Sequence, residues 1–226
     1  LLFDVFGTVV DWRPGIAREL KTWGDERGLR ADWHKVADAW RGLYQPAMER
    51  VRSGNRGFVR LDLLHEENLH EVCHQLDDRI LGMRYPPPWL QEGLAVTFEG
   101  ARLDDEGQIA AFGELPADVR ARLRATVEGG GEGWWGVRRL VGTRSVEPLH
   151  GTDRVHDFYA QAASLVAFLL EDRAYTRVLF YELIEQARRA TSRPLHAWRD
   201  FEDVLGRHGE TPEGFEARWR EAIPRL

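Results

Sequence analysis

Apolar residues recur every three or four positions through most of the second half of the chain, which is the period of a helix buried on one side. The longest such pattern runs from Asp153 to Leu170. Shorter patterns, three of which open on a proline, predict helices over Trp89 to Phe98, Pro116 to Val127, Thr176 to Ala190, Pro194 to Arg207 and Pro212 to Ala222. The sequence therefore predicts a mainly helical fold.

Three segments lack this helical period. Residues 101–112 surround the turn residues Asp104-Asp105-Glu106-Gly107 and predict a short β-hairpin. Residues 1–10 form an apolar run interrupted by Asp4, as in buried parallel strands whose carboxyl ends carry function. Residues 129–133 are glycine-rich but follow no strand and lack a Gly-Lys-Ser/Thr ending, so we interpret them as a connector rather than a phosphate-binding loop.

The composition is that of an ordinary soluble globular chain of 226 residues, with 43% hydrophobic and 30% charged residues. A net charge of −6 and dispersed arginines predict no nucleic-acid partner. A single cysteine excludes an internal disulfide framework. No apolar run is long enough to span a membrane, and no signal peptide is visible. Because the sequence opens without Met inside an apparent strand, we treat it as a possible fragment and leave compartment and oligomeric state open.

The segment His70-Glu71-Val72-Cys73-His74 carries the strongest candidate chemistry. On a helix, residues four apart lie on one face, so His70 and His74 can bind one metal ion. Apolar residues at helical spacing predict that this helix is half-buried, with Cys73 as a packing residue: Leu69, Val72, Cys73, Leu76 and Ile80. Three prolines then end it, and Glu92 on the next helix can supply a third ligand. Two histidines and a glutamate are a common ligand set of catalytic zinc.

This motif and the later block Pro87-Pro88-Trp89-Leu90-Gln91-Glu92-Gly93-Leu94-Ala95-Val96-Thr97-Phe98-Glu99 resemble the gluzincin metallopeptidases, particularly their bacterial peptidase-MA-like group. The resemblance covers about residues 68–226. It implies zinc bound by His70, His74 and Glu92, Glu71 as general base, and a peptide or protein substrate. The alternative is that these residues lie on solvated helix faces.

The segment from Tyr159 to Leu170, within the longest predicted helix, also resembles that group, which carries a helix of this kind behind the metal site. A tyrosine or histidine near zinc can donate a hydrogen bond to the oxyanion of the tetrahedral intermediate, and Tyr159 and His156 are the candidates. The alternative for Tyr159 is a core aromatic whose hydroxyl is satisfied locally.

Residues 1–68 resemble the amino-terminal part of the haloacid dehalogenase superfamily, closest to the 2-haloacid dehalogenases. The segments that carry this resemblance include Phe3-Asp4-Val5-Phe6-Gly7-Thr8, Ala39-Trp40-Arg41, Tyr44-Gln45-Pro46 and Leu61-Asp62-Leu63-Leu64. This resemblance implies Asp4 as a nucleophile and Arg41 as a ligand of the carboxylate or halide. Phe6 stands where phosphatases of this superfamily carry a second Asp. The superfamily's later Ser/Thr, Lys and acidic motifs are missing, because no βαβ alternation follows residue 70 and no lysine follows Lys35.

These observations predict a mainly α (α+β) protein in two parts: a haloacid dehalogenase-like fragment over 1–68, with one truncated strand and helices, and a gluzincin-like helical metal core over 69–226. The two resemblances belong to unrelated folds, so the chain is a natural fusion, an assembly artefact or a made chimera. Zinc-dependent peptide hydrolysis is the first hypothesis. A 2-haloacid dehalogenase using Asp4 and an inactive zinc-binding remnant are the alternatives.

Overall fold

The computed structural model describes residues 12–26, 30–54, 57, 59, 70, 71, 73, 74, 83, 86–100, 102, 103, 109–111, 114–131, 133–171, 176–189 and 197–225. Most of these residues are helical, which confirms the predicted class. The strand predicted over residues 1–10, with Asp4, lies outside the described residues. The only strands within the described part of the chain are two short ones elsewhere.

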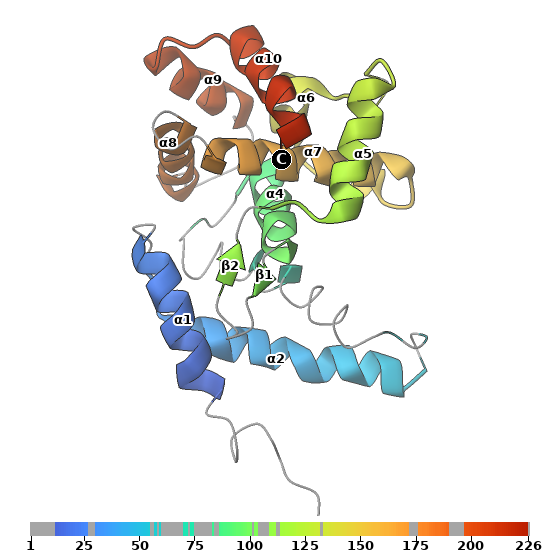
Figure 1. The fold of residues 1–226 in the computed structure, drawn as a ribbon, viewed down its shortest axis with the longest axis vertical. Helices are drawn as coiled ribbons and strands as arrows, with labels where there is room; N and C mark the ends of the chain where they lie inside the picture. The colour runs from blue at the N-terminus through green and yellow to red at the C-terminus, as the bar shows by residue number, and fades with distance from the viewer. Residues whose placement is uncertain are drawn as a thin grey trace, which may run out of the picture.

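The elements follow one another along the chain as Figure 1 shows. They are α1 (Trp12–Glu26), α2 (Trp33–Arg52), α4 (Pro88–Glu99), β1 (Arg102–Leu103), β2 (Ile109–Ala111), α5 (Ala117–Glu128), α6 (Gly136–Gly142), the 3-10 helix η1 (Glu147–Leu149), α7 (Asp153–Glu171), α8 (Thr176–Arg189), α9 (Ala197–Arg207), α10 (Pro212–Ala222) and the 3-10 helix η3 (Ile223–Arg225). The predicted helices are confirmed to within a few residues. β1 and β2 pair antiparallel, which confirms the hairpin.

Helix α7 lies at the centre of the helical group, with α4, α5, α8 and α10 arranged around it (Figure 1). From Ala160 to Leu169 every side chain is buried. A helix that is buried all round belongs to the core of a fold rather than to its surface. The sequence pattern predicted only one buried side for this helix. Because its other sides are buried too, the polar residues Gln161 and Ser164 also belong to the core.

Two polar side chains of α7 form hydrogen bonds inside this core. The Gln161 side chain accepts from the Trp135 backbone N–H and donates to the Gly133 carbonyl, both at 2.9 Å. The Ser164 hydroxyl accepts from the Trp219 indole N–H at 3.2 Å. Buried polar groups are tolerated when such bonds are made, so these two residues tie α10 and the segment before α6 to α7.

The glycine-rich segment before α6 is held by specific contacts. Gly130, Gly131 and Gly133 have φ values of 82°, 86° and 87°, which side-chain-bearing residues rarely adopt. The Glu216 carboxylate of α10 accepts from the Trp134 indole N–H at 2.8 Å and from the Val137 N–H at 2.9 Å. The segment is a connector, as predicted, and its bonds to α7 and α10 were not visible in the sequence.

Helices α1 and α2 pack against each other and lie apart from the helices around α7 (Figure 1). Gly24 of α1 allows this contact, because a Cβ atom there would lie 2.2 Å from the Trp33 ring. The predicted boundary between residues 68 and 69 falls in a stretch outside the described residues. The division into two domains stays a prediction.

Helices α4 and α7 approach each other closely at Gly93. A Cβ atom at Gly93 would lie 2.6 Å from the Ala162 carbonyl oxygen and 2.7 Å from a Val166 methyl group. No real Cβ is found so close to another heavy atom, so only glycine permits this approach. Because Gly93 follows Glu92, the contact also determines where the Glu92 carboxylate is placed.

Replacing Gly93 with alanine is expected to push α4 away from α7. Overpacking of this kind costs about 1–3 kcal/mol, which chemical unfolding of Gly93→Ala would measure. The control is Gly206→Ala on α9, where an added Cβ meets nothing within 4 Å. That variant should be as stable as the parent or more so, because alanine favours helix. Equal stability of the two variants would contradict the close contact.

Candidate metal centre

His70, Glu71, Cys73 and His74 have helical backbone, as predicted for the motif. The side chains of His70 and His74 face Glu92 of α4 and not bulk solvent. The Nε2 atom of His70 lies 3.3 Å from Oε2 of Glu92, and the Nε2 atom of His74 lies 3.6 Å from the same oxygen. The three residues each present one ligand atom within 4.8 Å of the others.

These distances suit a small divalent cation. Ligand atoms about 2.1 Å from one ion and arranged tetrahedrally are about 3.4 Å apart. The two distances to the Glu92 oxygen are within about 0.2 Å of that value. Two imidazole nitrogens and a carboxylate oxygen are also ligands that zinc accepts, and three protein ligands leave a fourth position open.

The buried Oε2 atom of Glu92 tests the fit further. Nε2 of His70 lies 3.3 Å from this oxygen without good hydrogen-bond geometry, and no other described residue donates a hydrogen bond to it, although Glu92 is only 9% exposed. A buried carboxylate oxygen without a hydrogen bond is costly, and a bound cation would satisfy it. The residues present therefore fit a metal ion.

Glu99 at the end of α4 contacts the other nitrogen of His70. The distance from Nδ1 of His70 to Oε1 of Glu99 is 2.7 Å. Since an ionised carboxylate only accepts hydrogen bonds, His70 donates through Nδ1. The Nδ1 atom of His74, in contrast, is buried without a hydrogen-bond partner in the described part of the chain.

The two histidines have opposite pKa shifts. Burial lowers the pKa of His70, but the neighbouring carboxylates of Glu92 and Glu99 outweigh it and raise the pKa to about 9. Burial lowers the pKa of His74, and the His70 charge adds to this effect against the opposing charge of Glu92. A cation must displace the proton of His70 to bind its Nε2 atom, so metal binding and protonation compete at this residue.

Tyr159 and Glu71 lie at the rim of the same cluster. The Tyr159 ring centroid is 6.4 Å from that of His70, and Tyr159 is half-buried. Burial, followed by the charges of Glu92, Glu71 and Glu99, raises the pKa of Tyr159 to about 12. Glu71 is exposed, and its charge also acts on His74. The described residues thus bring together five predicted site residues: His70, Glu71, His74, Glu92 and Tyr159.

The remaining candidates have different surroundings. His156 is exposed, and the ring contact with His70 is made by Tyr159 instead. Cys73 is buried in the main hydrophobic cluster, which confirms it as a packing residue. The Arg41 guanidinium lies 4.8 Å from the Tyr44 ring centroid. Asp4 is outside the described residues, so its role as nucleophile stays a prediction.

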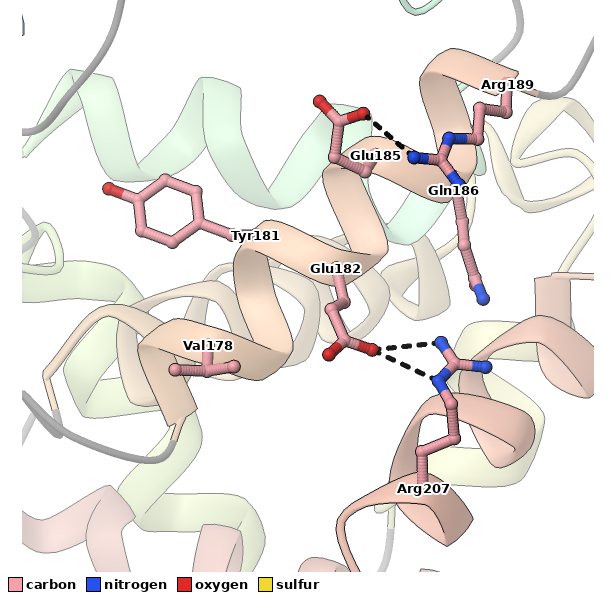
Figure 2. A pocket seen from close by; sticks show the side chains of 7 residues that line it. All are labelled: Val178, Tyr181, Glu182, Glu185, Gln186, Arg189 and Arg207. Atoms are coloured by element: carbon pink, nitrogen blue, oxygen red, sulfur yellow. Dashed lines mark hydrogen bonds and ion pairs between the residues drawn. The ribbon is translucent and has the colours of Figure 1, made fainter.

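A separate surface hollow of about 600 Å³ lies along α8 and the end of α9 (Figure 2). Its charged residues are paired with one another: Glu182 with Arg207 at 2.9 Å, and Glu185 with Arg189 at 3.9 Å. Hydrogen bonds from His208 and Arg207 lower the pKa of Glu182. None of the predicted site residues lines this hollow, so the candidate chemistry belongs to the histidine–glutamate cluster.

Comparison of the chain with protein-family models, curated proteins and solved structures finds no match. The resemblances to gluzincins and to haloacid dehalogenases therefore stay predictions that rest on the quoted motifs. Within the described residues, no helix is long and apolar enough to cross a membrane.

Zinc is expected to stabilise the chelator-treated protein. At free zinc a hundredfold above the dissociation constant, binding adds about 2.7 kcal/mol to the free energy of unfolding. Thermal unfolding would show this as a rise in Tm. Magnesium should not reproduce the rise, because it prefers six oxygen ligands. The same titration on His74→Ala should leave Tm unchanged, and an equal rise in that variant would rule out the assigned ligands.

Proposed function

We propose that this protein is a zinc-dependent metallopeptidase that hydrolyses peptide bonds. The observation that carries the proposal is the approach of both imidazole Nε2 atoms to one oxygen of Glu92, at 3.3 and 3.6 Å, beside Glu71 and Tyr159. His70, His74 and Glu92 would hold the zinc ion. When bound, zinc lowers the pKa of a water molecule and polarises the scissile carbonyl.

Glu71 is suited to act as general base. It follows His70 directly on the helical backbone, and its exposed side chain can meet water and substrate. Its charge acts on both His74 and Tyr159, so the carboxylate is within electrostatic range of the cluster. In this role Glu71 takes a proton from the attacking water and delivers it to the departing amine.

Tyr159 is suited to stabilise the negative charge that develops on the carbonyl oxygen. With a pKa of about 12 its hydroxyl keeps its proton at neutral pH and remains a donor. A donor held in place before the reaction stabilises the oxyanion more than water does. α7 supplies such support, because it is buried along most of its length.

The choice of peptide as substrate rests on the motif His70-Glu71-x-x-His74 with its downstream block around Glu92. α4 begins at Pro88, one residue before the predicted start at Trp89, and the Glu92 carboxylate lies near both histidines. The dehalogenase alternative would act on a 2-halo acid without metal. An inactive zinc-binding remnant would bind zinc without turnover.

Glu71→Gln is expected to lower kcat/KM by about 100- to 10,000-fold, since the base is lost while the metal ligands remain. The assay is cleavage of a mixed-sequence peptide library by the zinc-loaded protein, followed by mass spectrometry. Glu202→Gln, an exposed position on α9, is the matched control. Zinc binding without cleavage in the parent protein would instead favour the inactive remnant. Halide release from a 2-halo acid in the presence of chelator would favour Asp4 chemistry.

Tyr159→Phe is expected to lower kcat by about 100-fold with little change in KM, because the hydroxyl acts on the transition state. Steady-state kinetics on one cleaved peptide would measure both constants. Tyr181→Phe on α8 is the control, because Tyr181 is 38% exposed and lines the separate hollow. An unchanged kcat for Tyr159→Phe would assign this residue to packing alone.

A further inference from the structure

Glu92 and Glu99 are seven residues apart on α4, and both carboxylates reach the same histidine. Seven residues are close to two full helical turns, so the two side chains project from one face. Glu92 approaches Nε2 of His70 and Glu99 approaches Nδ1. One short helix thus contacts both nitrogens of one imidazole ring.

The position of Glu99 is electrostatically unfavourable for a purely structural residue. It is the last residue of α4, where unpaired carbonyl groups carry partial negative charge and disfavour an acidic side chain. Its side chain is only 28% exposed, so solvent screens this repulsion incompletely. The hydrogen bond from His70 offsets the repulsion between this carboxylate and the helix-end carbonyl groups. Glu99 is therefore stabilised in this position by its contact with His70.

The backbone around Glu99 is held closely. A Cβ atom at the next residue, Gly100, would lie 1.8 Å from the Glu114 carbonyl oxygen. The chain after the hairpin therefore packs directly on the end of α4. This contact limits where the Glu99 side chain can begin and favours one orientation toward His70.

A histidine that donates through Nδ1 presents the lone pair of Nε2 to a metal. An acceptor at Nδ1 selects this tautomer, orients the ring and makes Nε2 a better ligand. His74 has no such acceptor among the described residues. The two histidines therefore differ within the described part of the chain: Nδ1 of His70 has a carboxylate partner, whereas Nδ1 of His74 has no hydrogen-bond partner.

We propose that Glu99 is a positioning residue that orients His70 and sets its tautomer for metal binding, through the hydrogen bond from Nδ1 to Oε1. The inference rests on the proposed zinc site. It adds a residue that touches neither the metal nor the substrate, and it assigns the effect to one of the two histidines.

The test compares zinc affinity in Glu99→Ala, Glu99→Gln and Glu128→Ala by competition with a chromophoric chelator. Glu128 is the matched control, since it is also the last residue of a helix, precedes a glycine and is exposed. Glu99→Ala should weaken zinc binding roughly 10- to 100-fold, as loss of such partners does elsewhere. Glu99→Gln keeps an acceptor without the charge and should fall between Glu99→Ala and the parent. Glu128→Ala should match the parent.

A second measurement separates positioning from general stability. In the zinc-loaded, nitrogen-15-labelled protein, the His70 Nδ1–H proton should give a slowly exchanging signal that is retained in Glu99→Gln and lost in Glu99→Ala. The His74 signals should not change between these variants. If Glu99→Ala folds poorly, Glu99→Gln alone still tests the proposal. This variant must keep the signal of the His70 Nδ1–H proton and bind zinc more weakly than the parent.

The outcomes distinguish this inference from the proposed function. A parent protein that binds no zinc overturns both. If the parent binds zinc and Glu99→Ala binds it equally tightly, only the role of Glu99 is overturned. Loss of affinity in Glu99→Ala with an unchanged His70 signal also overturns it, because the effect then comes from charge or folding rather than from the tautomer.

Discussion

The contact between Gly93 and the backbone of Ala162 determines the geometry of the site. Because α4 touches α7 without an intervening side chain, the two helices are held at one separation. Glu92 lies next to this contact on α4, and Tyr159 lies one turn before it on α7. The separation of Glu92 and Tyr159, to which the proposed function assigns the metal and the oxyanion, is therefore set by this contact. Residues with ordinary side chains at this crossing would allow a looser and more variable arrangement.

Helix positions were largely predictable from the sequence, and the reason is local. The patterns of α5, α7 and α10 repeat over three or more turns, which is enough to define a period. α6 has seven residues, too few to show one, and it was missed. The hairpin was predictable from its turn residues. The full burial of α7 was not, because one-sided periodicity does not show how many neighbours a helix has in three dimensions.

The residues of the candidate site likewise divide into those that the sequence predicts and those that only the structure shows. His70 and His74 are four residues apart, so helical geometry alone places them together. Glu92 could be proposed as a third ligand from the proline turn and the following helix, and the gluzincin resemblance strengthened that prediction. Glu99 is the last residue of the block that resembles the gluzincins, but the sequence assigned it no role, because its contact with His70 is visible only in the structure. Gln161 and Glu216, which hold the segment before α6, are likewise recognisable only from their hydrogen bonds.

The burial of α7 on all sides has a consequence for motion. Local opening of a protein begins where few apolar groups are buried, and the middle of α7 is the opposite case. Because α4 packs directly on α7 at Gly93, α4 is also expected to resist local opening. Tyr159 and Glu92 therefore belong to the part of the cluster least prone to local opening, whereas the Glu71 side chain is exposed. If the proposed site widens to admit a substrate, α4 and α7 are expected to keep their relative positions.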